Sequence, residues 1–179
     1  MHTVEAQLKN SSINLFGLVE ESIVDGDGIR LVVFVQGCPH ACKGCHNPDS
    51  HSLQGGTVYS LWDIAQKAIK NPLLSGVTFS GGEPFLRYAT ELALLAQFVK
   101  SKGLNVWCYT GYTLEELKHL AITDASITHL LNEIDVLVEG RFIESQKSLL
   151  LKFRGSSNQR VIDLQAMRSN KTQDIIIKL

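Results

Sequence analysis

Residues 30–48 read RLVVFVQGCPHACKGCHNP, so an apolar stretch leads directly into three closely spaced cysteines. The apolar part is rich in β-branched and aromatic residues, as buried strands are, and we therefore expect a strand over residues 30–36. The loop after it carries the pattern C-x3-C-x2-C, formed by Cys38, Cys42 and Cys45. This odd number of clustered thiols limits the kinds of metal site that the loop can form.

An iron–sulfur cube has four iron corners and is normally held by four thiolates. Three clustered cysteines without a second pair nearby therefore predict a cube with one iron left open for chemistry. A structural zinc site usually closes with four ligands, often from two C-x2-C pairs. From the residues alone, zinc with His40, His46 or His51 as fourth ligand and unpaired core thiols both stay open. The distant Cys108 is expected to be a buried free thiol and not the fourth ligand.

Length and composition predict one domain without a strong electrostatic field. The 179 residues are 44% hydrophobic, enough to bury one core, so we expect a single domain over residues 1–179. With 17 basic and 18 acidic side chains, no broad field favours nucleic acid or a membrane surface. The apolar runs fall short of the about 20 residues that cross a bilayer. The first residues do not resemble a signal peptide, which favours the reducing cytoplasm over disulfides.

Strands and helices are expected to alternate along the chain. The strands are predicted at residues 13–19, 30–36, 76–80, 104–109 and 134–138, and the helices at 61–70, 88–102, 113–120 and 126–133. Thr113 and Glu116 form a capping box for one of these helices. Repeated strand–helix units indicate a parallel sheet with right-handed crossovers. Because a complete eight-stranded barrel needs about 200 residues or more, we predict an α/β fold with a partial, incomplete parallel β/α barrel.

Three segments are expected to meet at the C-terminal ends of the strands, where such folds carry their active sites. They are the cysteine loop, residues 80–84 (Ser-Gly-Gly-Glu-Pro) and residues 109–112 (Tyr-Thr-Gly-Tyr). Gly81 and Gly82 lack Cβ atoms, so backbone can approach a ligand there, and Glu83 offers a carboxylate for an ammonium group. The alternative is an ordinary glycine turn with a solvated glutamate.

These motifs resemble the radical S-adenosylmethionine superfamily, whose signature is C-x3-C-x2-C after the first barrel strand, followed by a Gly-Gly-Glu type motif. More closely, the chain is similar to the activating enzymes of glycyl radical enzymes, and within them to the anaerobic ribonucleoside-triphosphate reductase-activating protein family. The resemblance covers nearly the whole chain. The segments that carry it are DGDGIR (25–30), GCPHACKGCHNP (37–48), SGGEP (80–84), WCYTGY (107–112), VEGRF (138–142) and RGSSNQ (154–159).

The resemblance implies a set of cofactor contacts. It implies that the clustered thiolates hold a [4Fe-4S] cluster whose open iron is chelated by the amino and carboxylate groups of S-adenosylmethionine; these metal ligands are Cys38, Cys42 and Cys45. It implies that the adenine is bordered by Gly44, Cys45 and His46, and that the methionine amino group is met by the turn of Gly81, Gly82 and Glu83. Many members of the superfamily have an aromatic residue where this chain has Gly44. The resemblance also implies that residues 25–30 lie beside the cluster, although a plain turn explains them equally well.

The activity implied by the resemblance is that of an oxidoreductase. The reduced cluster passes one electron to the sulfonium, and the resulting 5′-deoxyadenosyl radical takes an α-hydrogen from a glycine of a partner protein. No catalytic side chain beyond cluster and cosubstrate is expected. The implied partners are the large subunit of anaerobic ribonucleoside-triphosphate reductase and a low-potential electron donor such as flavodoxin or ferredoxin, with no nucleic acid and no membrane. The alternatives are an activase of the pyruvate formate-lyase type, a small-molecule radical enzyme and a non-catalytic zinc module.

Overall fold

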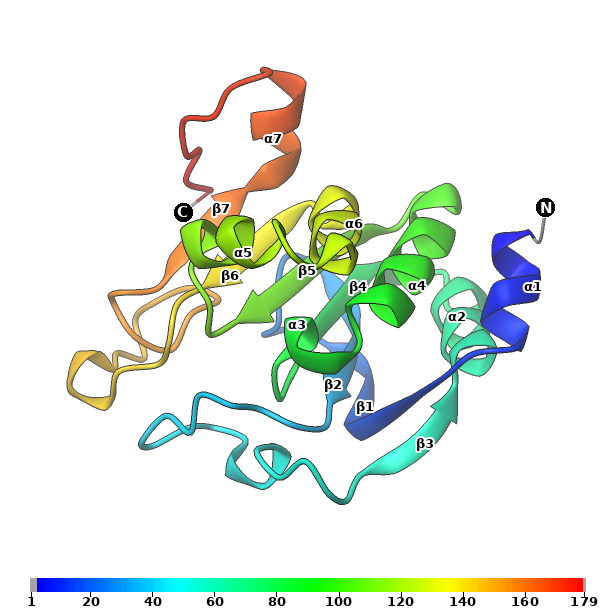
Figure 1. Cartoon of the computed structure of the whole chain (residues 1–179), viewed down its shortest axis with the longest axis horizontal. Helices are drawn as coiled ribbons and strands as arrows, with labels where there is room; N and C mark the ends of the chain where they lie inside the picture. Colours follow the sequence, from blue (N-terminus) through cyan, green and yellow to red (C-terminus); the bar gives the residue numbers. More distant parts are fainter. Residues whose placement is uncertain (1–2, 179) are drawn as a thin grey trace.

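The computed structural model describes residues 3–178, which form one seven-stranded sheet with helices packed on it (Figure 1). The strands are β1 (Ser12–Ser22), β2 (Ile29–Val35), β3 (Thr57–Ser60), β4 (Leu74–Gly81), β5 (Asn105–Thr110), β6 (Val136–Glu139) and β7 (Arg160–Asp163). The helices are α1 (Val4–Lys9), α2 (Leu61–Lys70), α3 (Pro84–Arg87), α4 (Ala89–Ser101), α5 (Leu114–Leu120), α6 (Ala125–Glu133) and α7 (Leu164–Ser169), with 3-10 turns at Pro48–Ser50 and Glu144–Gln146.

The sheet is mixed and has the strand order β3-β1-β2-β4-β5-β6-β7. The central strands β2, β4, β5 and β6 are parallel, whereas β1 is antiparallel to both of its neighbours and β7 is antiparallel to β6. The expected α/β class is therefore confirmed, but the expectation of a parallel sheet is wrong at both edges. A parallel crossover needs about a dozen residues or more, and the link between β1 and β2, residues 23–28, is too short for one.

The helices follow local signals that the sequence carries. Helix α4 buries Leu92, Leu95 and Val99 on one face, as their spacing of three and four residues requires. Helix α5 begins with the expected capping box: the Glu116 amide donates to Thr113 Oγ1 over 3.1 Å, and the Thr113 amide donates to Glu116 Oε2 over 2.7 Å. Both helices pack against the central strands through the large core.

Strand β5 shows that the sheet is covered on both faces. Its residues Val106 and Cys108 belong to the large core that includes α4 and α6. Between them, Trp107 points to the opposite face and packs with Val138 of β6, and its ring centroid lies 5.2 Å from that of Phe153. Burial on both faces explains why this strand is a continuous apolar run instead of an alternating one.

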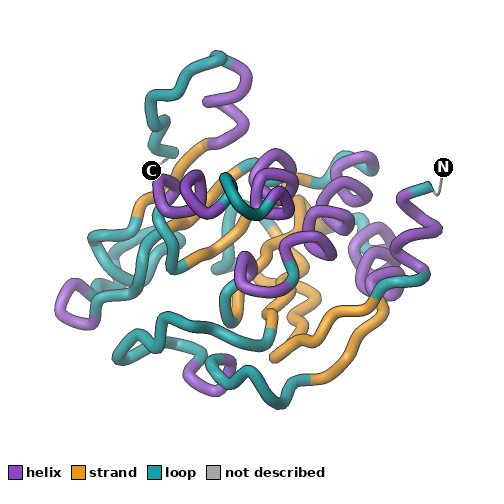
Figure 2. Tube along the Cα trace, in the orientation of Figure 1, coloured by secondary structure: helices purple, strands orange, loops and turns teal. Residues whose placement is uncertain are grey.

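Two long loops leave the C-terminal ends of the parallel strands on the same side of the sheet (Figure 2). The first, residues 36–56, follows β2, and the second, residues 140–159, follows β6. They touch, because Lys43 Nζ lies 3.2 Å from Glu144 Oε2. The cysteine loop thus lies beside a second loop that is distant in sequence.

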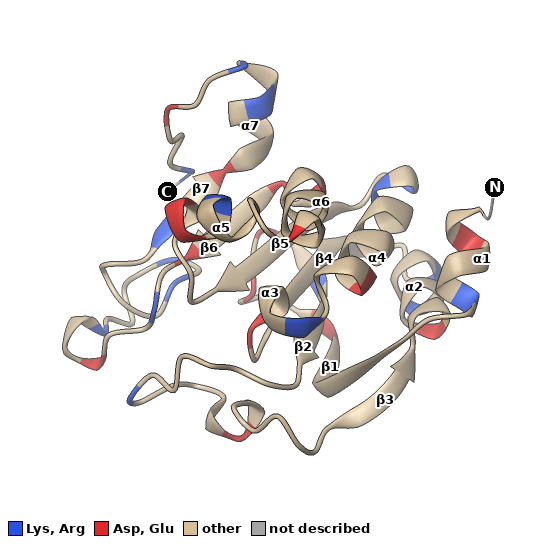
Figure 3. Ribbon diagram, viewed as in Figure 1, with Lys and Arg blue, Asp and Glu red and all other residues tan. Residues whose placement is uncertain are grey.

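Charged side chains of both signs are spread over the molecule (Figure 3). This distribution agrees with the net charge of −1. Within residues 3–178, no helix is both long and apolar enough to cross a bilayer.

Candidate metal centre

The cysteine loop is held at both of its ends by backbone hydrogen bonds. The Gly37 amide donates to Ser50 O over 2.8 Å and the Cys38 amide donates to His51 O over 3.1 Å. The Cys45 amide donates to Cys42 O over 3.2 Å, so a tight turn brings the second and third cysteines together. The loop that carries the thiols is therefore part of the ordered hydrogen-bonding scheme of the fold.

Gly44 has a conformational reason to be glycine. Its φ is +74°, a left-handed conformation that residues with a Cβ adopt at a cost. A Cβ at this position would also lie 3.0 Å from Glu144 Oε1 in the neighbouring loop. The backbone conformation and the close approach of the second loop both account for the absence of a side chain before Cys45.

The three segments expected to meet do line one cavity, which measures about 120 Å³. Its wall contains all three clustered cysteines, which are free and partly buried. Its wall also contains Gly81, Gly82, Tyr109, Thr110, Gly111 and Phe142. The ends of β2, β4 and β5 thus bring the cysteine loop, the Gly-Gly-Glu turn and the residues after β5 to one place.

The donor set fits an iron–sulfur cube better than a single ion. Within residues 3–178, no three His, Cys, Asp or Glu side chains converge as the ligands of one ion do. A cube is held differently, because each thiolate binds an iron of its own, so three free thiols around one cavity suit it. Burial raises the pKa of the Cys38 thiol to about 11, so a metal bound there must displace a proton.

Two of the nearby histidines contact other side chains. His40 Nε2 lies 2.8 Å from Glu83 Oε2, and the His46 ring packs against Phe142 with 5.2 Å between the ring centroids. His51 also lines the cavity. A zinc site that used His40 as its fourth ligand would have to break the contact between His40 and Glu83.

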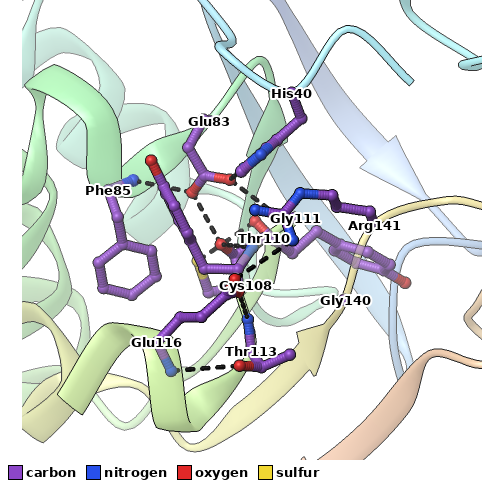
Figure 4. A network of polar contacts seen from close by, with 12 residues as sticks. His40, Glu83, Phe85, Cys108, Thr110, Gly111, Thr113, Glu116, Gly140 and Arg141 are labelled. Atoms are coloured by element: carbon purple, nitrogen blue, oxygen red, sulfur yellow. Dashed lines mark hydrogen bonds and ion pairs between the residues drawn. The ribbon is translucent and has the colours of Figure 1, made fainter. Parts of the chain in front are cut away.

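The carboxylate of Glu83 is the centre of a buried polar network (Figure 4). The residue is 1% exposed. Its Oε1 accepts from Thr110 Oγ1 over 2.8 Å and from the Phe85 amide over 3.1 Å. Its Oε2 accepts from the Gly111 amide over 2.9 Å and meets His40 Nε2 over 2.8 Å. A carboxylate has about four lone-pair positions, and protein donors occupy all of them here. The expected contact of Glu83 with an ammonium group stays a prediction.

The segment of residues 154–159 folds back on the end of β6. Gln159 Oε1 accepts from the Gly155 and Ser156 amides over 2.9 and 3.1 Å, and its Nε2 donates to Gly140 O over 2.9 Å. Asn158 Nδ2 donates to Arg141 O over 2.9 Å. These contacts give the polar residues of the segment a structural role: they close the loop of residues 140–159 against the cavity.

Arg30 does not lie beside the cysteine loop, contrary to the expectation drawn from the family resemblance. It is fully buried at the start of β2, where it pairs in register with Gly76. Its guanidinium donates to Thr78 Oγ1 over 2.6 Å and to Asp27 O over 3.0 Å, and burial lowers its pKa to about 10. The cysteines follow the opposite end of β2, about 16 Å along the strand at about 3.3 Å per residue.

Sequence reasoning found the segments of the site but missed several contacts within it. Thr110 and Gly111 were expected near the site without a role, and the structure places both on Glu83. Phe142 packs on His46. Cys108 is buried and free, as expected, and burial raises the pKa of its thiol. No local signal reveals such contacts, because they join residues far apart in the chain.

The chain is similar to a known protein family and to several known proteins, and the family match covers all the segments that line the cavity. Residues 24–162 match the family described as a 4Fe-4S single cluster domain. A protein from Haemophilus influenzae is 38% identical over 146 residues, which cover 76% of this chain and 89% of the relative. One from Vibrio cholerae is 40% identical over 147 residues, with 76% and 89% covered. One from Escherichia coli is 33% identical over 153 residues, with 80% and 94% covered. Each of the three is named anaerobic ribonucleoside-triphosphate reductase-activating protein.

Proposed function

The chain belongs to the anaerobic ribonucleoside-triphosphate reductase-activating protein family, and we propose that it is the oxidoreductase that installs a glycyl radical on the large subunit of that reductase. The observation that carries the proposal is the set of three free cysteines around one cavity at the ends of parallel strands. The match to a 4Fe-4S single cluster domain supports the same cofactor.

The proposed roles of the residues follow from their places around the cavity. Cys38, Cys42 and Cys45 would hold a [4Fe-4S] cluster. When bound and reduced, that cluster supplies the electron that splits S-adenosylmethionine into methionine and the radical that abstracts hydrogen from glycine. The backbone around Gly44 and His46 would border the adenine.

The Gly-Gly-Glu turn would orient the methionine end of the cosubstrate. Gly81 and Gly82 line the cavity, so their peptide groups could contact a ligand bound there. With cosubstrate and partner in place, the walls around them would have to keep water from the reacting atoms, as a radical reaction requires. No acid–base side chain is needed, so the histidines need not be catalytic.

The open sheet would serve as the incomplete barrel that such chemistry uses, within a single domain that acts in the reducing cytoplasm, where cysteine thiols stay free. A low-potential donor such as flavodoxin or ferredoxin would supply the electron. The side of the cavity between the two long loops would admit the partner. We propose this side because a protein substrate must bring its glycine to the cavity.

The test is anaerobic reconstitution with iron and sulfide, followed by incubation with reductant and S-adenosylmethionine. We expect 5′-deoxyadenosine, measured by chromatography, and a glycyl radical signal by electron paramagnetic resonance once the cognate reductase is added. An iron-loaded protein that makes no 5′-deoxyadenosine would overturn the proposal. Cleavage without a radical on the reductase would favour an activase of another enzyme or a small-molecule substrate, and zinc without iron would favour the non-catalytic module.

We propose that the reductase contacts the tip of the loop of residues 140–159. Leu149 and Leu150 are 92% and 96% exposed there, and nothing else in residues 3–178 gives two neighbouring leucines such exposure. The same loop contacts the cysteine loop through Glu144 and Lys43. We therefore expect a partner that brings a glycine to the cavity to touch this tip as well, because exposed apolar side chains favour protein contact.

Replacing Leu149 and Leu150 together with serine is expected to weaken binding of the reductase about tenfold or more, since a few buried apolar anchors carry most of an interface energy. The measurement is the Kd for the reductase by surface-immobilised binding under anaerobic conditions. The matched control is Ile122→Ser, because Ile122 is 77% exposed and follows α5, away from the cysteine loop. Both variants should keep the wild-type melting temperature. Equal Kd values for the two variants would contradict the proposed contact.

A further inference from the structure

Glu83 connects three parts of the chain that are distant in sequence. His40 belongs to the cysteine loop, Thr110 ends β5 and Gly111 follows it, and Phe85 lies in the first turn of helix α3. All four groups lie within 3.1 Å of the two carboxylate oxygens (Figure 4). We call these five residues the Glu83 network.

The network joins the cysteine loop to the end of β5 by a short chain of atoms. His40 lies between Cys38 and Cys42 in sequence, so holding its ring restrains the first turn of the loop. The ring also packs edge-on against Tyr112, with 4.5 Å between the centroids. A Cβ at Gly111 would lie 2.3 Å from the His40 ring. The two segments are therefore in direct contact as well as sharing a carboxylate.

We propose that Glu83 is a positioning residue whose carboxylate holds the cysteine loop against the backbone after β5, instead of binding the ammonium group of the cosubstrate. Because a carboxylate only accepts hydrogen bonds, Nε2 of His40 carries the hydrogen in this contact. Charge-assisted hydrogen bonds are stronger than neutral ones, and the network has four of them around one buried group. This inference rests on the proposed iron–sulfur function only where it concerns the cosubstrate.

The network predicts a specific failure in the variant Glu83→Gln. An amide has one acceptor oxygen and one NH₂ group, so in either orientation its NH₂ faces a backbone amide that is itself a donor, that of Phe85 or of Gly111. Both the cysteine loop and the segment after β5 should then open more often. Thr110→Val is the second variant, because it removes the hydroxyl that donates to Glu83 and accepts from the Tyr112 amide over 3.1 Å.

The experiment is hydrogen–deuterium exchange of the metal-free protein, read separately for residues 38–47, 109–113 and 61–70. In Glu83→Gln and Thr110→Val, we expect exchange to be about tenfold faster in the first two segments. This factor corresponds to the loss of about one hydrogen bond to a charged group. Residues 61–70 form α2, outside the network, and should exchange as in the wild type. Thr110→Ser keeps the hydroxyl and should restore slow exchange.

A second readout separates positioning from direct binding. The dissociation constant for S-adenosylmethionine is measured on the iron-loaded protein by equilibrium dialysis without reductant. We expect it to rise in both Glu83→Gln and Thr110→Val, and to stay near the wild-type value in Thr110→Ser. Weaker binding in Glu83→Gln alone, with unchanged exchange in the metal-free protein, would show that the carboxylate meets the cosubstrate directly and would overturn the inference. A wild-type protein that takes up no iron would refute the proposed function, while exchange in the metal-free protein would still decide the role of Glu83.

Discussion

Cys42→Ala is expected to fold and yet retain almost no iron or sulfide after anaerobic reconstitution. The wild-type loop offers three thiolates for three corners of a cube, and the variant leaves a second iron without a protein ligand. Cys42 is only partly buried, so its loss removes little packing. We expect the same result for Cys38→Ala and Cys45→Ala, with no 5′-deoxyadenosine above the reaction without protein. The measurements are iron and sulfide content and Mössbauer spectra.

The matched control is Cys108→Ala, which removes a thiol from the core and none from the loop. Cys108 is fully buried in β5, so we expect a loss of about 1 kcal/mol in the free energy of unfolding and normal iron uptake. Circular dichroism of each metal-free variant checks that it folds. If Cys108→Ala lost the cluster, or if Cys42→Ala kept it, the assignment of the three-cysteine loop would be refuted.

The elements that sequence alone predicts well are those with strong local signals. Helix α2 has the predicted limits, residues 61–70, and α4 and α6 are each within two residues of theirs. Their apolar residues recur with the helical period, and capping side chains, Ser60 and Asp124, begin α2 and α6. The strands that escaped prediction, β3 (Thr57–Ser60) and β7 (Arg160–Asp163), have four residues each. Such short edge strands hold too few residues to show a period, and their pairing is decided by the strand beside them.

In the candidate site, too, the features with local sequence signals are predictable and the contacts between distant residues are not. The cysteine spacing and the Gly-Gly-Glu-Pro turn are local patterns, so the sequence places both at strand ends. The partners of Glu83 are not local: His40 is 43 residues before it and Thr110 is 27 residues after it. Only the order of the parallel strands brings these residues together. Sequence reasoning therefore named Glu83 as a site residue and missed which groups hold its carboxylate.

Gly82→Ala is expected to lower the free energy of unfolding by about 3 kcal/mol, the sum of a clash in a packed region and the loss of backbone hydrogen bonds. A Cβ at this position would lie 2.2 Å from Gly37 O and 2.9 Å from Val35 O. Those are the acceptors of the Glu83 and Gly82 amides, over 2.7 and 2.8 Å respectively. The clash is with backbone, so no side chain can turn away to relieve it. Thermal unfolding of the metal-free protein should show a midpoint lower by roughly 6–12 °C.

The control for this prediction is Gly17→Ala in β1, where an added Cβ would meet no atom within 4 Å. Because glycine weakens a strand interior, this variant should be as stable as the wild type or slightly more stable. Equal losses in the two variants would mean that the contact between the Gly-Gly-Glu turn and the start of the cysteine loop has no special importance. A loss confined to Gly82→Ala would show that this turn supports the cysteine loop through its backbone before any cofactor binds. The same backbone contact would then position both the loop and the turn in the metal-free protein.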